Sequence, residues 1–220
     1  MKKSFTTAVV LALLVHPASA GQTTNPFDEW VLIGEGFSAR VDDAVLLSEY
    51  PGSKGIMLIS PDSYGADVAI EFDIMPLNPE SVLVAMIAAS SSGNTLSFPD
   101  NYDGSISYLL ESVHGYFFAF HNAAHNRTPF VRQHPFTRGE SQDIAAASEN
   151  IMSQRWHHIA ISVAEKGGLQ LRIDGVPILN AKTANPLGGG NVILRLRGTN
   201  SHTASALIKN FRLAAGKLDD

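Results

Sequence analysis

Cysteine is absent from this sequence of 220 residues. That absence excludes a disulfide framework, a thiolate nucleophile and a cysteine-ligated zinc site. Basic residues are scarce as well, because 16 Lys and Arg stand against 21 Asp and Glu, for a net charge of −5. A chain without a basic excess has little with which to neutralise phosphates, so we expect no nucleic-acid partner. Hydrophobic residues make up 45% of the chain, which suffices for a core and argues against intrinsic disorder.

The N-terminus has the features of a secretory signal peptide. Lys2 and Lys3 form a basic start, and Phe5–Val15 is an uncharged, mostly apolar run. That run is too short for a bilayer-spanning helix, which needs about 20 residues. Small residues precede the expected cleavage site after Ala20. We therefore predict a signal peptide over residues 1–20 and a mature protein over residues 21–220, secreted or periplasmic, with a net charge of −7 and no membrane partner.

Short apolar runs separated by turn residues recur throughout the mature chain. Residues 68–74 and 169–173 alternate strictly between apolar and polar positions. Such alternation indicates strands with one buried and one polar face. Asp174-Gly175 is a hairpin signal between two runs, because both residues tolerate positive φ. The pattern predicts a single all-β domain over residues 21–220, a sandwich or a barrel, with Ser105–Val113 among its strands.

Four segments resemble the concanavalin A-like lectin and glucanase superfamily. They are the Tyr-Gly strand of residues 64–73, the Trp-His strand of residues 155–163, the strand of residues 169–175 that ends in Asp-Gly, and the last strand, residues 207–213. The resemblance implies a jelly-roll β-sandwich of two antiparallel sheets with a carbohydrate partner. The order of the pieces is also similar to small secreted sugar-active proteins of the DUF1961 and DUF1080 families, of the 3-keto-glycoside hydrolase or lyase type.

The richest polar stretch is residues 121–134, which follow an aromatic strand that starts near Tyr116. This stretch opens a long segment, residues 122–153, that fits no strand. Long polar loops after sheet strands are favoured locations for binding and catalysis. Arginine binds carboxylates in a bidentate manner, and His or Tyr transfers protons. We predict His121, His125 and Tyr116 as proton-transfer groups. The predicted substrate-binding residues are Asn122, Asn126, Arg127, Arg132 and His134. The alternative is a solvated loop whose histidines cap turns.

Two further pairs of charged residues lie on predicted strands. Arg195 and Arg197 share a strand face. We predict that they also bind substrate, as the lining of a groove for an anionic ligand. The alternative is that they are exposed solubilising residues, a common role of arginine pairs. Glu71 and Asp73 share another strand face. Paired carboxylates suggest glycoside hydrolysis, but Pro76 stands where the superfamily's glycosidases carry a second Glu. A charged, solvated face is therefore the expected role of Glu71 and Asp73.

The histidines of the polar stretch also raise the possibility of a metal site. On a continuing strand His121 and His125 would lie roughly 13 Å apart, too far to share an ion. A folded loop could bring them together with His134. No Glu accompanies them in a known ligand pattern. We therefore predict no cofactor, with a metal ion as the alternative.

These observations predict an exported carbohydrate-active protein, a lyase or hydrolase acting on a glycan or modified sugar in a concave cleft. The alternative is a non-catalytic carbohydrate-binding sandwich, and a structural or protein-binding sandwich remains a third possibility. Aromatic platforms would favour binding, but the sequence has only two tryptophans. The carbohydrate is a poly- or oligosaccharide, with acidic sugars among the candidates.

Overall fold

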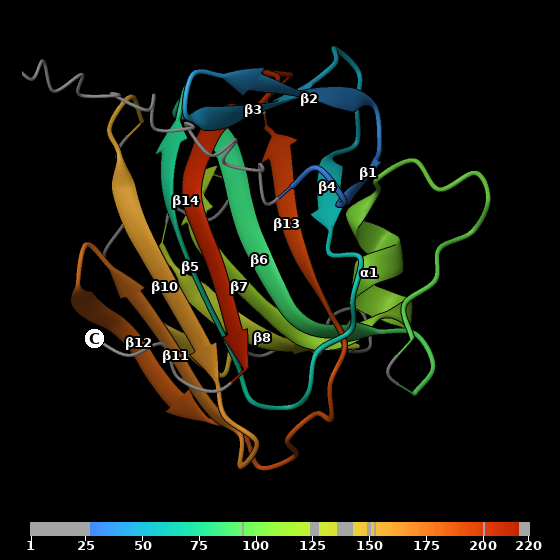
Figure 1. The fold of residues 1–220 in the computed structure, drawn as a ribbon, viewed down its shortest axis with the longest axis vertical. Helices are drawn as coiled ribbons and strands as arrows, with labels where there is room; N and C mark the ends of the chain where they lie inside the picture. The colour runs from blue at the N-terminus through green and yellow to red at the C-terminus, as the bar shows by residue number, and fades with distance from the viewer. Residues whose placement is uncertain are drawn as a thin grey trace, which may run out of the picture.

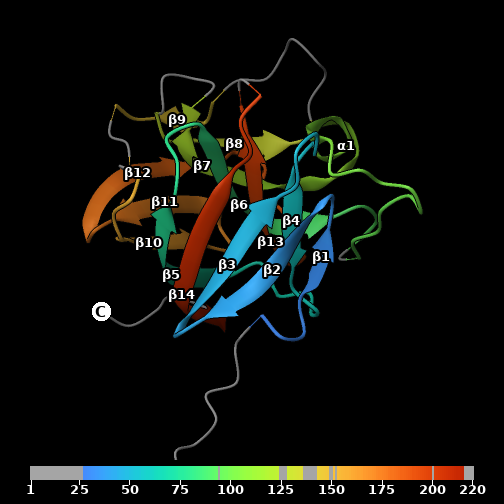
Figure 2. The same cartoon turned by 90° about the horizontal axis from the view of Figure 1, so that it is seen from above.

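The computed structural model describes residues 27–93, 95–123, 128–135, 143–148, 151, 153–199 and 201–215. Two antiparallel seven-stranded sheets pack against each other in these residues (Figure 1, Figure 2). The first sheet has the order β1-β4-β13-β6-β7-β8-β9, and the second has the order β12-β11-β10-β5-β14-β3-β2. This architecture confirms the predicted jelly-roll β-sandwich.

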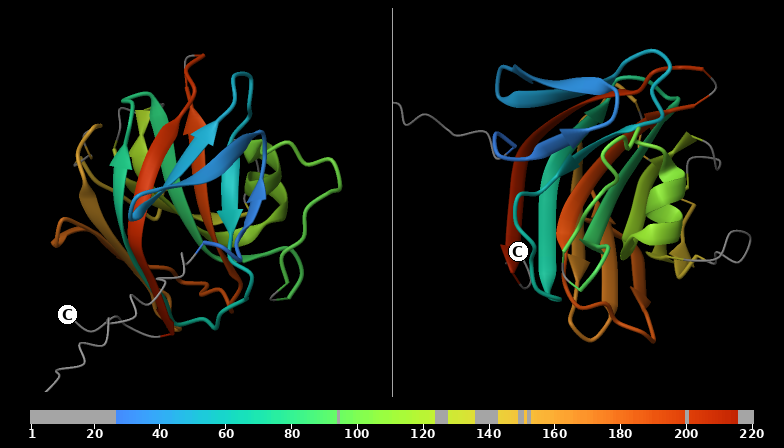
Figure 3. Two further views of the ribbon diagram at one scale, coloured as in Figure 1. Left: turned by 45° about the horizontal axis from the view of Figure 1, so that its top comes forward. Right: turned by 90° about the vertical axis from the view of Figure 1, so that its right-hand side faces the viewer.

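The strand bounds of the first sheet are β1 (Val31–Ile33), β4 (Ile56–Ile59), β6 (Ser81–Ser90), β7 (His114–Asn122), β8 (Phe130–His134), β9 (Ala145–Ala146) and β13 (Asn191–Gly198). Those of the second sheet are β2 (Gly36–Val41), β3 (Ala44–Glu49), β5 (Val68–Pro76), β10 (His157–Val163), β11 (Gly168–Ile173), β12 (Val176–Lys182) and β14 (Ser205–Ala215). The helix α1 (Ile106–Ser112) lies beside the first sheet (Figure 3).

The alternation in the sequence determines which face of each strand is buried. In β5, Ile70, Phe72 and Ile74 are buried, whereas Glu71 and Asp73 between them are partly exposed. The Asp174-Gly175 turn joins β11 to β12, and both residues have positive φ. The predictions for these strands and this hairpin are therefore confirmed.

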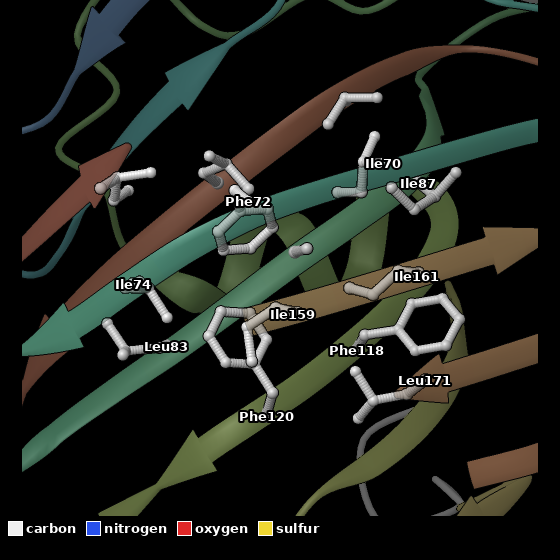
Figure 4. Packing of buried hydrophobic residues seen from close by; sticks show 14 of the residues in the cluster. Ile70, Phe72, Ile74, Leu83, Ile87, Phe118, Phe120, Ile159, Ile161 and Leu171 are labelled. Carbon is white, nitrogen blue, oxygen red and sulfur yellow. The ribbon is translucent and has the colours of Figure 1, made fainter. Parts of the chain in front are cut away.

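The main core lies between the two sheets and contains side chains from both. Phe72 of β5 contacts Phe120 of β7, with ring centroids 5.8 Å apart (Figure 4). Ile70, Ile159 and Leu171 are also fully buried in this cluster. Burying one such side chain contributes about 1.5–3 kcal/mol. A core of this extent stabilises the fold without disulfide bonds.

The prediction of a strand over Ser105–Val113 is wrong, because this segment forms the helix α1. The side chain of Ser105 caps the helix by accepting a hydrogen bond from the amide of Ser107. Leu109 and Val113, four residues apart, pack on the outer face of the first sheet. Apolar residues spaced by three and four positions mark one face of a helix. The spacing of the apolar residues in this segment is therefore that of a helix.

The segment after residue 122 contains more regular structure than its composition suggested. It includes β8 and β9, which extend the first sheet beyond β7.

The predicted signal peptide lies outside the described residues. Within the described ranges, no helix combines the length and apolar character needed to cross a membrane.

Candidate functional site

A pocket of about 520 Å³ opens on the outer face of the first sheet, the face turned away from the main core. Its floor carries outward-facing side chains of β6, β7, β8 and β13, and α1 contributes apolar residues. The apolar lining residues are Val82, Ile106, Leu110, Phe117 and Phe130. The other lining residues are Lys54, Ser105, Asn122, Arg132, His134, Arg195, Arg197, Gly198 and Thr199. The volume is in the range of small-ligand sites.

A β-bulge in β7 decides which polar side chain enters this pocket. Val84 of β6 pairs with Ala119, but the next residue, Leu83, pairs with His121, so that β7 carries one extra residue at Phe120. A bulge of this kind shifts the alternation of a strand by one position. Asn122 thereby shares the outer face with Phe117 and lines the pocket. The extra residue thus turns the amide of Asn122 toward the pocket.

The amide of Asn122 is a polar group available to a ligand. Asn122 is only 2% exposed, yet its side chain makes no hydrogen bond to another described residue, although buried polar groups normally have partners. An amide offers two donors and an acceptor, so it can both donate to and accept from a polar ligand.

Arg195 is buried at the bottom of the same pocket. Its Nη2 donates to the carbonyl oxygens of Lys54 at 2.9 Å and Gly104 at 3.2 Å. Its Nε has no hydrogen-bond partner among the described residues. Burial lowers the pKa of the guanidinium to about 10, so Arg195 still carries its charge at neutral pH. No described carboxylate forms an ion pair with it.

The other cations of the lining are already paired with acids. Lys54 Nζ lies 2.7 Å from Asp103. Arg132 pairs with Asp143 and lies over the ring of Phe130, 4.2 Å from its centroid. These pairs hold the cations at the rim in fixed positions.

Arg197 is held in the same way on β13. Its Nη1 donates to the carbonyl oxygen of Ser53 and lies 3.7 Å from Glu49 Oε1. Glu49 is itself buried. Its Oε2 accepts hydrogen bonds from the amides of Gly198 and Ala204. Of the four cations, Arg195 is thus the one without an acidic partner among the described residues.

His134 is a neutral component of the pocket. Its ring packs edge-on against Phe117, with centroids 5.1 Å apart. Burial lowers the pKa of the imidazole to about 4, because the charged form is poorly solvated there. At neutral pH the side chain is therefore uncharged.

The pocket unites five of the predicted site residues, Asn122, Arg132, His134, Arg195 and Arg197. Two predicted proton-transfer groups lie elsewhere. Tyr116 is fully buried and its hydroxyl accepts a hydrogen bond from the amide of Leu187 at 2.7 Å. His121 is also buried, and its Nδ1 donates to the carbonyl oxygen of Ser81 at 2.7 Å. Neither lines the pocket. The remaining three, His125, Asn126 and Arg127, lie outside the described residues.

Sequence reasoning missed several lining residues. Phe117 lies within the aromatic run of residues 116–120, and Phe130 lies in the segment that was expected to form no strand. Alternation along β7 could have separated Phe117 from its core-facing neighbours. Lys54 and Ile106 come from distant parts of the chain, and no local pattern connects them to the site.

Glu71 and Asp73 form a separate polar network on the outer face of the second sheet. Glu71 pairs with Arg212 at 3.0 Å. Asp73 contacts His158 Nδ1 at 2.8 Å and accepts a hydrogen bond from Asn210 at 2.6 Å. These contacts fit the expected charged, solvated face. Within the part of the chain that is described, no group of three or more His, Asp or Glu side chains is arranged to hold a metal ion.

Comparison with solved structures identifies the fold. A protein of unknown function with a galectin-like fold from Bacillus subtilis superposes with a TM-score of 0.70 at 16% identity, over 86% of this chain and 90% of its own. The carbohydrate-binding module CBM66 from Bacillus subtilis gives 0.58 at 16% identity, over 84% and 94%. The metal-free Emp46p carbohydrate recognition domain gives 0.62 at 12% identity, over 90% and 94%.

The chain thus has a galectin-like β-sandwich fold, similar to these three solved structures. No family model matches the sequence, and the search of curated proteins finds no significant match. The narrower resemblance to the DUF1961 and DUF1080 families is not confirmed. At identities of 12 to 16% the likeness establishes the fold alone.

Proposed function

We propose that this chain is a carbohydrate-binding protein that holds a glycan in the pocket on the outer face of the first sheet, without chemical turnover. The observation that carries the proposal is the amide of Asn122, which lines a pocket with an aromatic floor and makes no hydrogen bond to another described residue. Sugars are bound by apolar contact with their CH faces and by hydrogen bonds to their hydroxyls. The pocket offers both kinds of contact. Structural neighbours that are named for carbohydrate binding add support.

The chemistry of the lining favours binding over the lyase or hydrolase activity expected from the sequence. Glycoside hydrolysis uses two carboxyl groups that flank the scissile bond, and no Asp or Glu is among the described lining residues. A proton-transfer group must reach its substrate, but Tyr116 and His121 are buried away from the pocket. The proposal therefore adopts the non-catalytic alternative.

Export remains part of the proposal. The basic start, the apolar run and the small residues before Gly21 support a cleaved leader. A secreted or periplasmic location would give the protein access to environmental glycans.

A glycan panel tests the proposal. The full chain is expressed, purified and incubated with immobilised and soluble glycans, and both retention and product mass are measured. We expect retention of at least one glycan class, no new reducing or unsaturated ends, and loss of retention in Asn122→Ala. New unsaturated ends would instead indicate a lyase, and new reducing ends a hydrolase. Absence of retention across the panel would contradict the proposal.

A further inference from the structure

We infer that the pocket selects an anionic sugar, and that Arg195 binds its carboxylate or sulfate group. This inference rests on the proposed function, because it names the class of glycan that the same pocket accepts.

The charge of the lining is the first observation. Four cationic side chains line the pocket, namely Lys54, Arg132, Arg195 and Arg197, and the described lining includes no acidic residue. The chain as a whole has more acidic than basic residues, 21 against 16. A hollow lined by one sign of charge concentrates ligands of the opposite sign. Because Lys54, Arg132 and Arg197 are paired with carboxylates, the net positive charge of the pocket rests on Arg195.

The coordination of Arg195 is the second observation. A guanidinium has five N–H donors in a fixed fork. Here the two hydrogen bonds to protein both start from Nη2, and both acceptors are neutral carbonyl oxygens, those of Lys54 and Gly104. Nε makes no hydrogen bond to a described residue and is itself buried. One donor of the guanidinium is therefore unused, and a ligand would reach it only by a small rearrangement of the pocket wall.

The third observation is that the other cations need no ligand to balance their charge. Lys54, Arg132 and Arg197 each have a carboxylate, from Asp103, Asp143 and Glu49 respectively. Taking an unpaired charge out of water is costly unless an opposite charge compensates it. Arg195 is 5% exposed and lines the pocket. An anionic ligand would supply the missing compensation.

Carboxylates and sulfates both fit this chemistry. Arginine forms parallel, charge-assisted hydrogen bonds with planar carboxylates and with the oxygens of sulfate or phosphate esters. Asn122 would then bind a neighbouring hydroxyl of the same sugar. The ligand class is therefore a glycan with acidic units, either uronic acids or sulfate esters.

The test measures the affinity of the purified protein, by calorimetry, for three classes of oligosaccharide. The first is an oligogalacturonate, the second a sulfated galactan oligosaccharide, and the third a neutral galactan oligosaccharide. We expect at least one anionic oligosaccharide to bind about tenfold to a hundredfold more tightly than the neutral one, since a hydrogen bond to a charged group contributes that much discrimination. The preference should shrink as the salt concentration rises.

The matched variants separate the anion contact from the rest of the site. Arg195→Met keeps most of the stem and removes the charge, and Arg195→Lys keeps the charge but removes the fork. We expect Arg195→Met to lose the anionic preference, measured as the ratio of the affinities for the anionic and the neutral oligosaccharide, and Arg195→Lys to retain part of that preference. Arg172→Met is the control, because Arg172 lies on β11 of the second sheet and also donates to a backbone carbonyl, that of Gly175 at 2.8 Å. It should bind like the wild type.

The outcomes distinguish this inference from the proposed function. Equal affinity for the anionic and neutral oligosaccharides in the wild type overturns the inference and leaves the proposed function intact. So does an unchanged anionic preference in folded Arg195→Met. If that variant does not fold, the inference is tested on the wild type alone. It stands if the wild type prefers the anionic oligosaccharide and loses this preference at high salt, and it is overturned otherwise. Absence of binding to all three classes, and to the wider panel, overturns the proposed function and the inference together.

Discussion

Gly55 packs directly against the guanidinium of Arg195: a Cβ placed on Gly55 would lie 2.5 Å from Nη2 and 2.9 Å from Cζ of the arginine. Because Gly55 has no side chain, the guanidinium of Arg195 can occupy this position beside its backbone. This contact joins the chain around residue 55 to β13, far along the sequence, at a side chain that lines the pocket.

The first prediction concerns Gly55→Ala. The added methyl group should displace Arg195 and lower the affinity for an anionic oligosaccharide by about tenfold, the value of one charge-assisted hydrogen bond. Gly55 also has a positive φ of 120°, so the variant should lose about 1–3 kcal/mol of unfolding free energy. Calorimetric titration and denaturant unfolding measure the two effects.

Gly52→Ala is the control for this change. Gly52 also has a positive φ, of 88°, but nothing lies within 4 Å of a Cβ at that position. It should lose stability while retaining its glycan affinity. Equal affinities of Gly55→Ala and Gly52→Ala would mean that the position of the guanidinium does not matter for binding.

The second prediction separates two neighbours on β7. Asn122→Ala should weaken glycan binding by about tenfold with little loss of stability, because its amide makes no hydrogen bond to another described residue. His121→Ala should lower the unfolding free energy by about 1–3 kcal/mol, because it removes a buried hydrogen bond to Ser81. The binding of folded His121→Ala should remain unchanged. A reversed pattern would restore His121 to the functional role expected from the sequence.

That contrast illustrates what the sequence could and could not predict. Alternation identified the strands around Phe72 and the shared face of Arg195 and Arg197, since both depend on local periodicity. The bulge at Phe120 depends on pairing with β6, which is distant in sequence. The sequence therefore placed both His121 and Asn122 in the site, but it could not show that only Asn122 faces the pocket.

A similar limit applies to α1. Its apolar residues were interpreted as a strand, although the helix is held by packing on the outer face of the first sheet. Short apolar runs are ambiguous between helix and strand until their neighbours are known. The apolar part of the pocket wall, which includes Ile106 and Leu110 of α1, could not be anticipated for this reason.

The third prediction concerns pH and His134. Its pKa is about 4 in the folded protein, because burial lowers it from the ordinary value of 6.5. The unfolded chain therefore takes up a proton at a pH where the folded protein does not, so stability is lost as the pH falls from about 6.5 to 4. The loss attributable to this histidine should be about 2–3 kcal/mol.

His134→Gln provides the comparison for this effect. Denaturant unfolding at pH 7 and at pH 4 should show a smaller loss of stability on acidification in the variant than in the wild type. An identical loss in both proteins would mean that His134 titrates normally in the folded state.

The fourth prediction concerns Glu49. Its carboxylate accepts hydrogen bonds from the amides of Gly198 and Ala204 and lies 3.7 Å from Arg197. Glu49→Ala should lower the unfolding free energy by about 2–4 kcal/mol, since two buried amides lose their acceptor. Glu49→Gln keeps one oxygen and should lose less. Equal stability of Glu49→Ala and the wild type, measured by denaturant unfolding, would contradict this role.

The most direct test of the account is an NMR titration of the labelled protein with an anionic oligosaccharide. The largest shift changes should fall on the side-chain amide of Asn122 and the guanidinium N–H groups of Arg195, with smaller ones on their neighbours around the pocket. If the changes instead cluster around His158 and Asp73 on the outer face of the second sheet, or if no resonance moves at saturating ligand, the assignment of this pocket as the glycan site is wrong.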